Sequence, residues 1–334
     1  MRFRIPTMIV LISIVPATSS ADTCRGSAVS IGLVARMEAG DQEHEDRQVR
    51  ELVHEFLRTN RNAPLLKLRK LHEQDPEAVQ RALPRLAAVV EHSSDEIAVC
   101  HVLDLFVRLD SLPFDVRNAV ARRFDRLTRK EMFAKAKASS VLLKFGPDRT
   151  AARAWLRNHL SDDERQLRLV AAAALGAVGE SAGDDLPALK SLLKDKSAAV
   201  RVAAACAIWS IAPNEELTED LVVPTLVDSL RVDDEAFYLE PMMISAVGFT
   251  HRQIAAAALG GCKRRTGDVT RALLPLLNER DDDVLRYVVL KSLARLGDRS
   301  DDVIVAVRRV ASADPNESLR AEAAATLRKL MGSP

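Results

Sequence analysis

The sequence predicts an all-α fold, an α–α superhelix of about seven stacked pairs of helices. Two observations predict it. A pattern that starts with Arg and carries Leu or Ile seven residues later recurs along the chain, mostly at spacings of 33 or 34 residues. Aromatic residues make up only 4% of the 334 residues, so the core depends on Ala, Leu and Val, which favours helices over sheets.

The first 21 residues have the features of a secretory signal peptide. Arg2 and Arg4 precede an apolar run over 5–15, and small residues lead up to a cleavage point after Ala21. The apolar run is shorter than the roughly 20 residues that span a bilayer. We therefore expect an exported protein, periplasmic or extracellular, with no transmembrane anchor after cleavage.

The next stretch, 22–45, lacks the repeat spacing and is expected to be a tether or a frayed segment. The repeats of 46–150 are degenerate and begin with a polar capping helix; in one of them Lys135 takes the place of Arg, with Leu142 seven residues on. The clear repeats occupy 151–334, with an insertion near 231–250.

The second helix of each clear repeat is rich in alanine. These helices are expected within 167–179, 200–212, 251–263, 285–297 and 319–331. We expect them to lie between neighbouring repeats, because Ala and Gly let helix backbones approach closely, and we assign this role to Gly260 as well. Gly146, Gly179 and Gly297 stand where a glycine ends such a helix.

The first helix of each pair is expected to be short, with proline in its first turn. Three segments show this pattern, at 83–92, 186–195 and 223–234. Proline is tolerated in a first turn because the early N–H groups have no partner within the helix.

An aspartate stands six residues before three of the repeated arginines. The pairs are Asp162 with Arg168, Asp195 with Arg201 and Asp314 with Arg320. With the repeat length, this pattern resembles the HEAT-repeat family of armadillo-type α-solenoids, including its HEAT-like proteins of the bilin-lyase type. The resemblance implies an Asp–Arg ladder between repeats and departs at Arg286, which has Arg280 six residues before it.

Two regions are candidate surfaces for a partner. The insertion gathers apolar and aromatic residues, which suit an adaptable contact but could equally pack on the repeats themselves: Phe237, Tyr238, Met242, Met243 and Phe249. From Asp115 to Arg157 the net charge is +8, so this basic run is either a solvated surface or a patch that binds an acidic partner. Its densest part contains Arg122, Arg123, Arg126, Arg129 and Lys130.

No enzyme motif is present. The sequence has no HExxH, no CxxC and no glycine-rich phosphate loop, so we expect neither a metal nor another cofactor. Cys100, Cys206 and Cys262 fall within expected helices, where thiols are typically buried, although a disulfide stays an alternative in an exported protein.

Function is expected to lie in binding. A formal charge of +1 does not favour nucleic acid as the partner. We expect a monomeric, non-catalytic scaffold or adaptor for another protein. The alternative is an enzyme accessory or bilin-lyase-like protein acting on another protein, which a tetrapyrrole absorbance band on purification would favour.

Overall fold

The alanine-rich segments form helices in a computed structural model of the chain, which describes residues 47–59, 62–146, 149–213, 218–232 and 250–332. These residues contain helices and no strand, so the fold is all-α. They form two compact units, an N-terminal unit that ends at Asp185 and a C-terminal unit that begins at Leu186.

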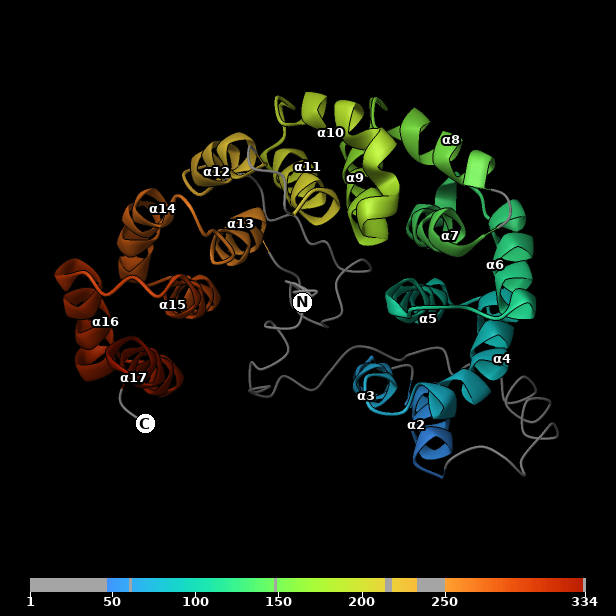
Figure 1. Cartoon of the computed structure of the whole chain (residues 1–334), viewed down its shortest axis with the longest axis horizontal. Coiled ribbons are helices and arrows are strands. Elements are labelled where there is room, and N and C mark those ends of the chain that lie inside the picture. The colour runs from blue at the N-terminus through green and yellow to red at the C-terminus, as the bar shows by residue number, and fades with distance from the viewer. Residues whose placement is uncertain (1–46, 60–61, 147–148, 214–217, 233–249, 333–334) are drawn as a thin grey trace. The chain divides into compact units, whose positions relative to one another are not determined.

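The N-terminal unit packs its helices in two rows. Helices α3, α5, α7 and α9 follow one another in the first row, and α2, α4 and α6 in the second (Figure 1). The elements are α2 (Arg47–Thr59), α3 (Ala63–His72), α4 (Pro76–His92), α5 (Glu96–Arg108), α6 (Phe114–Arg126), η2 (Arg129–Glu131), α7 (Met132–Phe145), α8 (Arg149–His159), α9 (Arg165–Val178) and η3 (Gly179–Asp185). The core between the rows includes the fully buried Phe56 and Phe106.

The C-terminal unit repeats this arrangement. Helices α11, α13, α15 and α17 form one row, and α12, α14 and α16 pack beside them. The elements are α10 (Leu186–Leu192), α11 (Ala198–Ile211), α12 (Thr218–Ser229), α13 (His251–Leu259), α14 (Thr266–Leu273), η5 (Leu274–Asn278), α15 (Asp283–Leu296), α16 (Asp301–Ala313) and α17 (Glu317–Met331). Every segment expected to be an alanine-rich helix is therefore helical, including the degenerate repeat that forms α7.

Five of the described α-helices begin at a polar N-cap. The cap side chain accepts hydrogen bonds from backbone N–H groups that have no partner within the helix, which is worth about 1 kcal/mol per helix. The caps are Asp75 for α4, Asp95 for α5, Thr250 for α13, Asp282 for α15 and Asn316 for α17.

The alanines serve close packing between successive helices. Ala255, Ala256 and Ala258 of α13 are fully buried. The Ser292 hydroxyl of α15 donates to the Ala256 carbonyl oxygen at 2.8 Å, so the two backbones lie almost in contact. At Gly260 an added Cβ would lie 2.8 Å from the Ser292 Cα, which confirms the role expected for this glycine.

Two of the three helix-ending glycines use a conformation that favours glycine. Gly179 and Gly297 have φ of 72° and 69°, in the left-handed region. Gly146 ends α7 with extended backbone at φ −78°, a conformation that any residue can adopt, so the left-handed region open to glycine is not used there. Its need for a small residue is steric, because an added Cβ would lie 2.7 Å from the Leu142 carbonyl oxygen.

The expected starts of two helices are wrong. Helix α4 begins at Pro76 with Asp75 as its cap, and Pro84 lies inside it. Helix α12 is described from Thr218, so Pro224 is also internal. Proline is common in the first turn, but a long helix packed between neighbours can also hold it in its interior, because packing compensates for the one hydrogen bond that proline removes.

Candidate functional site

The first candidate surface, the insertion, lies outside the described residues. All five of its named residues, from Phe237 to Phe249, fall within 233–249. The other sequence-predicted residues are described, and the structure assigns each of them contacts or an exposure.

The basic run is largely engaged in contacts within the N-terminal unit. Arg122 on α6 donates through Nε and Nη2 to the two carboxylate oxygens of Glu91, at 2.6 and 2.8 Å. Arg126 donates to the Glu91 backbone oxygen at 2.8 Å, and Arg123 lies 3.7 Å from Glu131. These arginines therefore connect α6 to the end of α4 and to η2.

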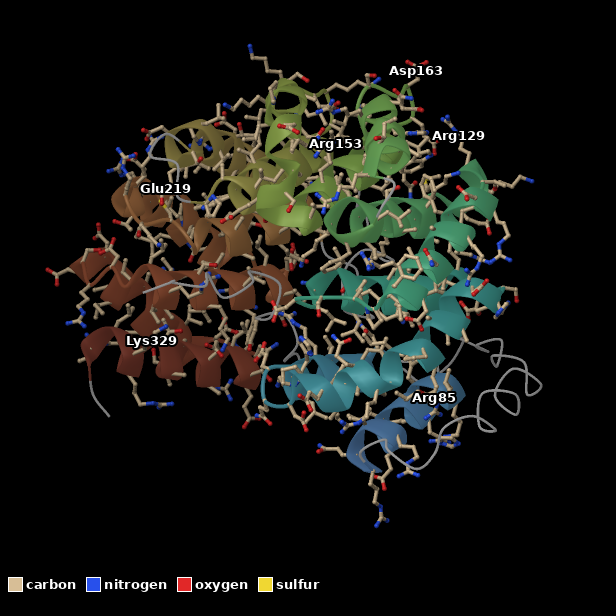
Figure 2. All side chains as sticks on the ribbon, turned by 45° about the vertical axis from the view of Figure 1, so that its right-hand side comes forward. Arg85, Arg129, Arg153, Asp163, Glu219 and Lys329 are labelled. Carbon is tan, nitrogen blue, oxygen red and sulfur yellow. The ribbon has the colours of Figure 1, made fainter. Side chains whose placement is uncertain are left out.

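Further along the run, Arg129 joins two consecutive repeats. Its guanidinium donates to both carboxylate oxygens of Asp162, at 2.9 and 3.1 Å, and to Glu164. Arg153 donates to Asp184 at 2.6 Å, and both guanidiniums lie among other charged side chains on the surface of the N-terminal unit (Figure 2). Arg157 donates to Asp185, whose side chain is fully buried.

The acids that neutralise this run stand about one repeat away in the sequence. The separations are 31 residues for Arg122 with Glu91, 33 for Arg129 with Asp162 and 28 for Arg157 with Asp185. Among the described basic side chains of the run, Lys130 alone has no hydrogen bond or ion pair. The net charge of +8 counted along the chain is therefore not a free basic patch in space.

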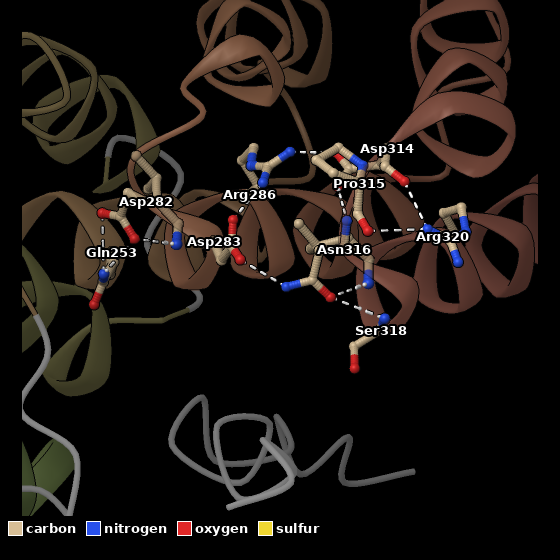
Figure 3. A network of polar contacts seen from close by, with 11 residues as sticks. Gln253, Asp282, Asp283, Arg286, Asp314, Pro315, Asn316, Ser318 and Arg320 are labelled. Carbon is tan, nitrogen blue, oxygen red and sulfur yellow. Dashed lines mark hydrogen bonds and ion pairs between the residues drawn. The ribbon is translucent and has the colours of Figure 1, made fainter. Parts of the chain in front are cut away.

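In the C-terminal unit a polar ladder connects the N-terminal ends of α13, α15 and α17 (Figure 3). Gln253 donates to both carboxylate oxygens of Asp282, at 2.9 and 3.1 Å, while Asp282 caps α15. Asn316, the cap of α17, donates to Asp283 at 2.6 Å. Each cap is thus fixed by a side chain from an adjacent helix.

Arg286 is the central member of the ladder. It is almost fully buried and donates to Asp283 on its own helix and to Asp314, which precedes α17. Hydrogen bonds from Asn316 and then Arg286 hold the pKa of Asp283 below its usual value and outweigh burial, which acts to raise it. An arginine that departs from the sequence motif therefore makes the contact between repeats.

The arginines that match the motif contact the loop before their own helix. Arg168, Arg201 and Arg320 each donate at 2.8 Å to the backbone oxygen of the aspartate six residues earlier. The carboxylate of that aspartate accepts instead from the backbone N–H two residues after it, as Asp195 does from Ser197 at 2.8 Å. The motif therefore also builds the loop before the helix.

A buried ionic cluster on α5 and α7 was missed by the sequence analysis. Asp104 accepts from Lys137 Nζ at 3.0 Å and from Arg108 Nε at 3.0 Å, and all three side chains are nearly buried. Burial alone would raise the pKa of Asp104, but the two cations outweigh it and hold that pKa well below its usual value. The signal available in the sequence was Lys137, two residues after Lys135, at the position where four of the five clear repeats carry an apolar residue: Val170, Ala203, Ile254 and Val288.

Next to this cluster lie two groups that could carry chemistry. Burial, helped by Lys137, lowers the pKa of His101 to about 4, so its imidazole is neutral at pH 7. Burial raises the pKa of Cys100 to about 12, which keeps the thiol protonated and a poor nucleophile. A neutral imidazole and a protonated thiol without an activating base give this cluster a structural role.

The other described thiols are also protonated. Burial raises the pKa values of Cys206 and Cys262 to about 12. Cys262 was expected within a helix but lies just after α13, which ends at Leu259. Its thiol donates to Glu219 at 3.1 Å. The same carboxylate accepts the backbone N–H groups of Lys263 and Arg264 at 2.8 Å, which fixes the loop between α13 and α14 to α12.

Exposed apolar side chains are a second feature that the periodicity did not predict. Phe114, the first residue of α6, is 66% exposed, with the Arg117 guanidinium 5.7 Å from its ring centroid. Ile97 on α5 is 53% exposed and Val305 on α16 is 63% exposed. Large exposed apolar side chains are typical of contact surfaces, and aromatic ones contribute most per residue.

The described ranges hold no cluster of three or more His, Cys, Asp or Glu side chains that could bind a metal ion. Nor does any helix in this part of the chain reach the length and apolarity needed to cross a bilayer.

No protein-family model and no curated protein matches this chain. Among solved structures it is similar to two engineered proteins from the Northeast Structural Genomics Consortium. The first is 18% identical, with 86% of this chain and 80% of that one covered and a TM-score of 0.43. The second is 16% identical, with 80% and 96% covered and a TM-score of 0.35.

Proposed function

We propose that the protein is an exported, non-catalytic scaffold or adaptor that holds another protein on a HEAT-type solenoid of about seven helical pairs. One observation carries the proposal: within each unit, the second helices of successive repeats pack side by side in series, α5 on α7 and α7 on α9, then α13 on α15 and α15 on α17. Such a series presents successive helices on one surface, which repeat proteins use to hold macromolecules.

The contacts between repeats support the HEAT-type part of the proposal. The Arg286 guanidinium binds Asp314 of the following repeat, which is the kind of contact implied by an Asp–Arg ladder. Arg129, which lies in η2 before α7, makes a second Arg–Asp contact between consecutive repeats, to Asp162 in the N-terminal unit. The partners of the two pairs stand 28 and 33 residues apart, about one repeat, as expected of stacked units.

The contacts of the basic run favour a protein over a nucleic acid as the partner. Arg122 and Arg129 are already paired with carboxylates, and a phosphate backbone would have to displace those carboxylates. The exposed Phe114 and the apolar residues of the insertion offer the aromatic and apolar contact that protein partners use.

Crosslinking capture from the exported fraction of the native host tests the proposal. Two variants should lose the captured protein: Phe114→Ala, and serine in place of Phe237, Tyr238, Met242, Met243 and Phe249. Their controls are Val305→Ala, which removes a similarly exposed side chain, and Asn or Gln in place of the insertion's acidic Asp233, Asp234 and Glu235. Loss from one test variant with retention by its control supports the proposal and identifies the surface. Identical capture by all variants, or none by the wild type, contradicts it.

Export has its own test. Mass spectrometry of protein from the exported fraction should find a mature N-terminus at Asp22, because cleavage is expected after Ala21. Full-length protein starting at Met1 and confined to the cytosol would contradict export and leave the binding proposal to be judged separately.

A further inference from the structure

One side of α17 carries an exposed stripe that spans the whole helix. Glu317, Ala321 and Arg328 are exposed, Ala324 is partly exposed and Met331 is 57% exposed. Spacings of four, three, four and three residues place these five residues on one face of an α-helix. Among the described helices, α17 packs mainly against α15 and α16, on its other faces.

The equivalent face of the preceding helices is a packing surface. Four residues after the repeated arginine, the Ala256 carbonyl of α13 accepts the Ser292 hydroxyl of α15. At the same position of α15, the Leu290 carbonyl accepts the Thr326 hydroxyl of α17 at 3.4 Å. Ala324 holds this position in α17, so its face corresponds to the one that receives the next helix in the two preceding repeats, on α13 and α15.

The charges of the stripe indicate what would cover it. Glu317 and Arg328 are separated by about 16 Å along the helix axis, so they cannot pair with each other. Neither makes an ion pair with a described residue. They bracket the two alanines symmetrically, with the acid at one end and the base at the other.

We propose that this face binds a second copy of the same chain, with the two α17 helices antiparallel about a two-fold axis. In that arrangement Glu317 of each copy faces Arg328 of the other, and Ala321 faces Ala324. Alanines at the contact let the helix axes approach to about 8 Å. Met331 would then lie against the second copy's Pro315, which is exposed here. A C2 interface requires such self-complementarity of one patch.

Charge reversal tests the proposal on the full mature chain, with association measured by analytical ultracentrifugation over a range of concentrations. The wild type should form dimers. Each single variant, E317R or R328E, places like charges at both ends of the contact and should weaken dimerisation by about tenfold or more. The matched control R308E reverses an exposed charge on α16, outside the stripe, and should dimerise like the wild type.

Mixing the two weakened variants makes the test specific. An E317R chain and an R328E chain form opposite-charge pairs only with each other, so the mixture should dimerise about as strongly as the wild type, whereas each variant alone dimerises more weakly. The double variant E317R/R328E should dimerise as well. A wild type that stays monomeric, a dimer that tolerates both single reversals, or a mixture that does not associate would overturn the proposal. Circular dichroism of each variant separates loss of association from loss of folding.

Discussion

The close contact between α13 and α15 gives a sharp prediction for Gly260→Ala. A Cβ at this position would lie 2.8 Å from the Cα, Cβ and Oγ of Ser292, whereas non-bonded carbons are comfortable at about 3.5–4.0 Å. Ser292 cannot move aside freely, because its hydroxyl is bound to the Ala256 carbonyl. The substitution must therefore push the two helices apart.

The expected loss can be worked out from two opposing effects. Overpacking of this kind costs about 1–3 kcal/mol. Replacing glycine by alanine also restricts the unfolded chain and returns about 0.4–1 kcal/mol, since the φ of −62° at Gly260 suits alanine. With the middle of each range the net loss is about 1.3 kcal/mol, which lowers the urea midpoint by about 0.6 M for a slope near 2 kcal/mol/M.

Urea unfolding followed by far-ultraviolet circular dichroism measures this loss. The control is Gly267→Ala in α14 of the same unit, where an added Cβ meets nothing within 4 Å. We expect the control to match or slightly exceed the wild type. If Gly260→Ala unfolds at the wild-type midpoint, or if both variants lose the same amount, the inferred steric contact between the helices is refuted.

Three further predictions concern the buried groups. His101 should make the free energy of unfolding fall as the pH drops from about 6.5 to about 4, because the imidazole of the unfolded chain binds a proton first. The loss over this range is on the order of 3 kcal/mol. H101Q should remove this pH dependence when unfolding is measured across the same range. Asp104→Ala leaves two buried cations without their carboxylate and should lower the free energy of unfolding by about 3–5 kcal/mol at pH 7. Lys137→Met keeps the pair between Asp104 and Arg108 and should cost less. Equal losses in thermal or urea unfolding would contradict the geometry of the cluster. Since the pKa of Asp104 is depressed, its contribution should be complete above about pH 4 and fade below it. Cys100 and Cys262 are buried and should resist Ellman's reagent in the native protein but react after denaturation, so fast labelling of either in the native state would contradict its burial.

The helical rows could be predicted from the sequence because the repeat constrains many positions at once. A period near 33 residues locates a helix even where the motif is weak, as in α7, where lysine replaces arginine. The helix starts were less predictable. Pro84 and Pro224 look like first-turn residues locally, and only the longer helices around them show that they are internal.

The polar contacts were predictable in type but not in detail. An Asp–Arg pattern was visible, yet the matching arginines bind backbone oxygens of the loop, while Arg286 reaches the aspartate of the next repeat. A guanidinium has five donors and can satisfy either arrangement. Which one forms depends on backbone geometry that residue spacing does not contain.

Charge counted along a repeat chain is a poor guide to charge on its surface. In a stack of helical pairs, a side chain meets residues one repeat away more readily than residues ten positions away. The run that contains Arg122 and Arg129 is therefore neutralised by Glu91 and Asp162, each about one period distant. A basic window flanked by acids at the repeat spacing predicts ion pairs between repeats, whereas a window without such acids predicts a free patch. By this criterion Glu317 and Arg328, which make no ion pair with a described residue and lie on the exposed stripe of α17, are better candidates for intermolecular contact than the more conspicuous basic run.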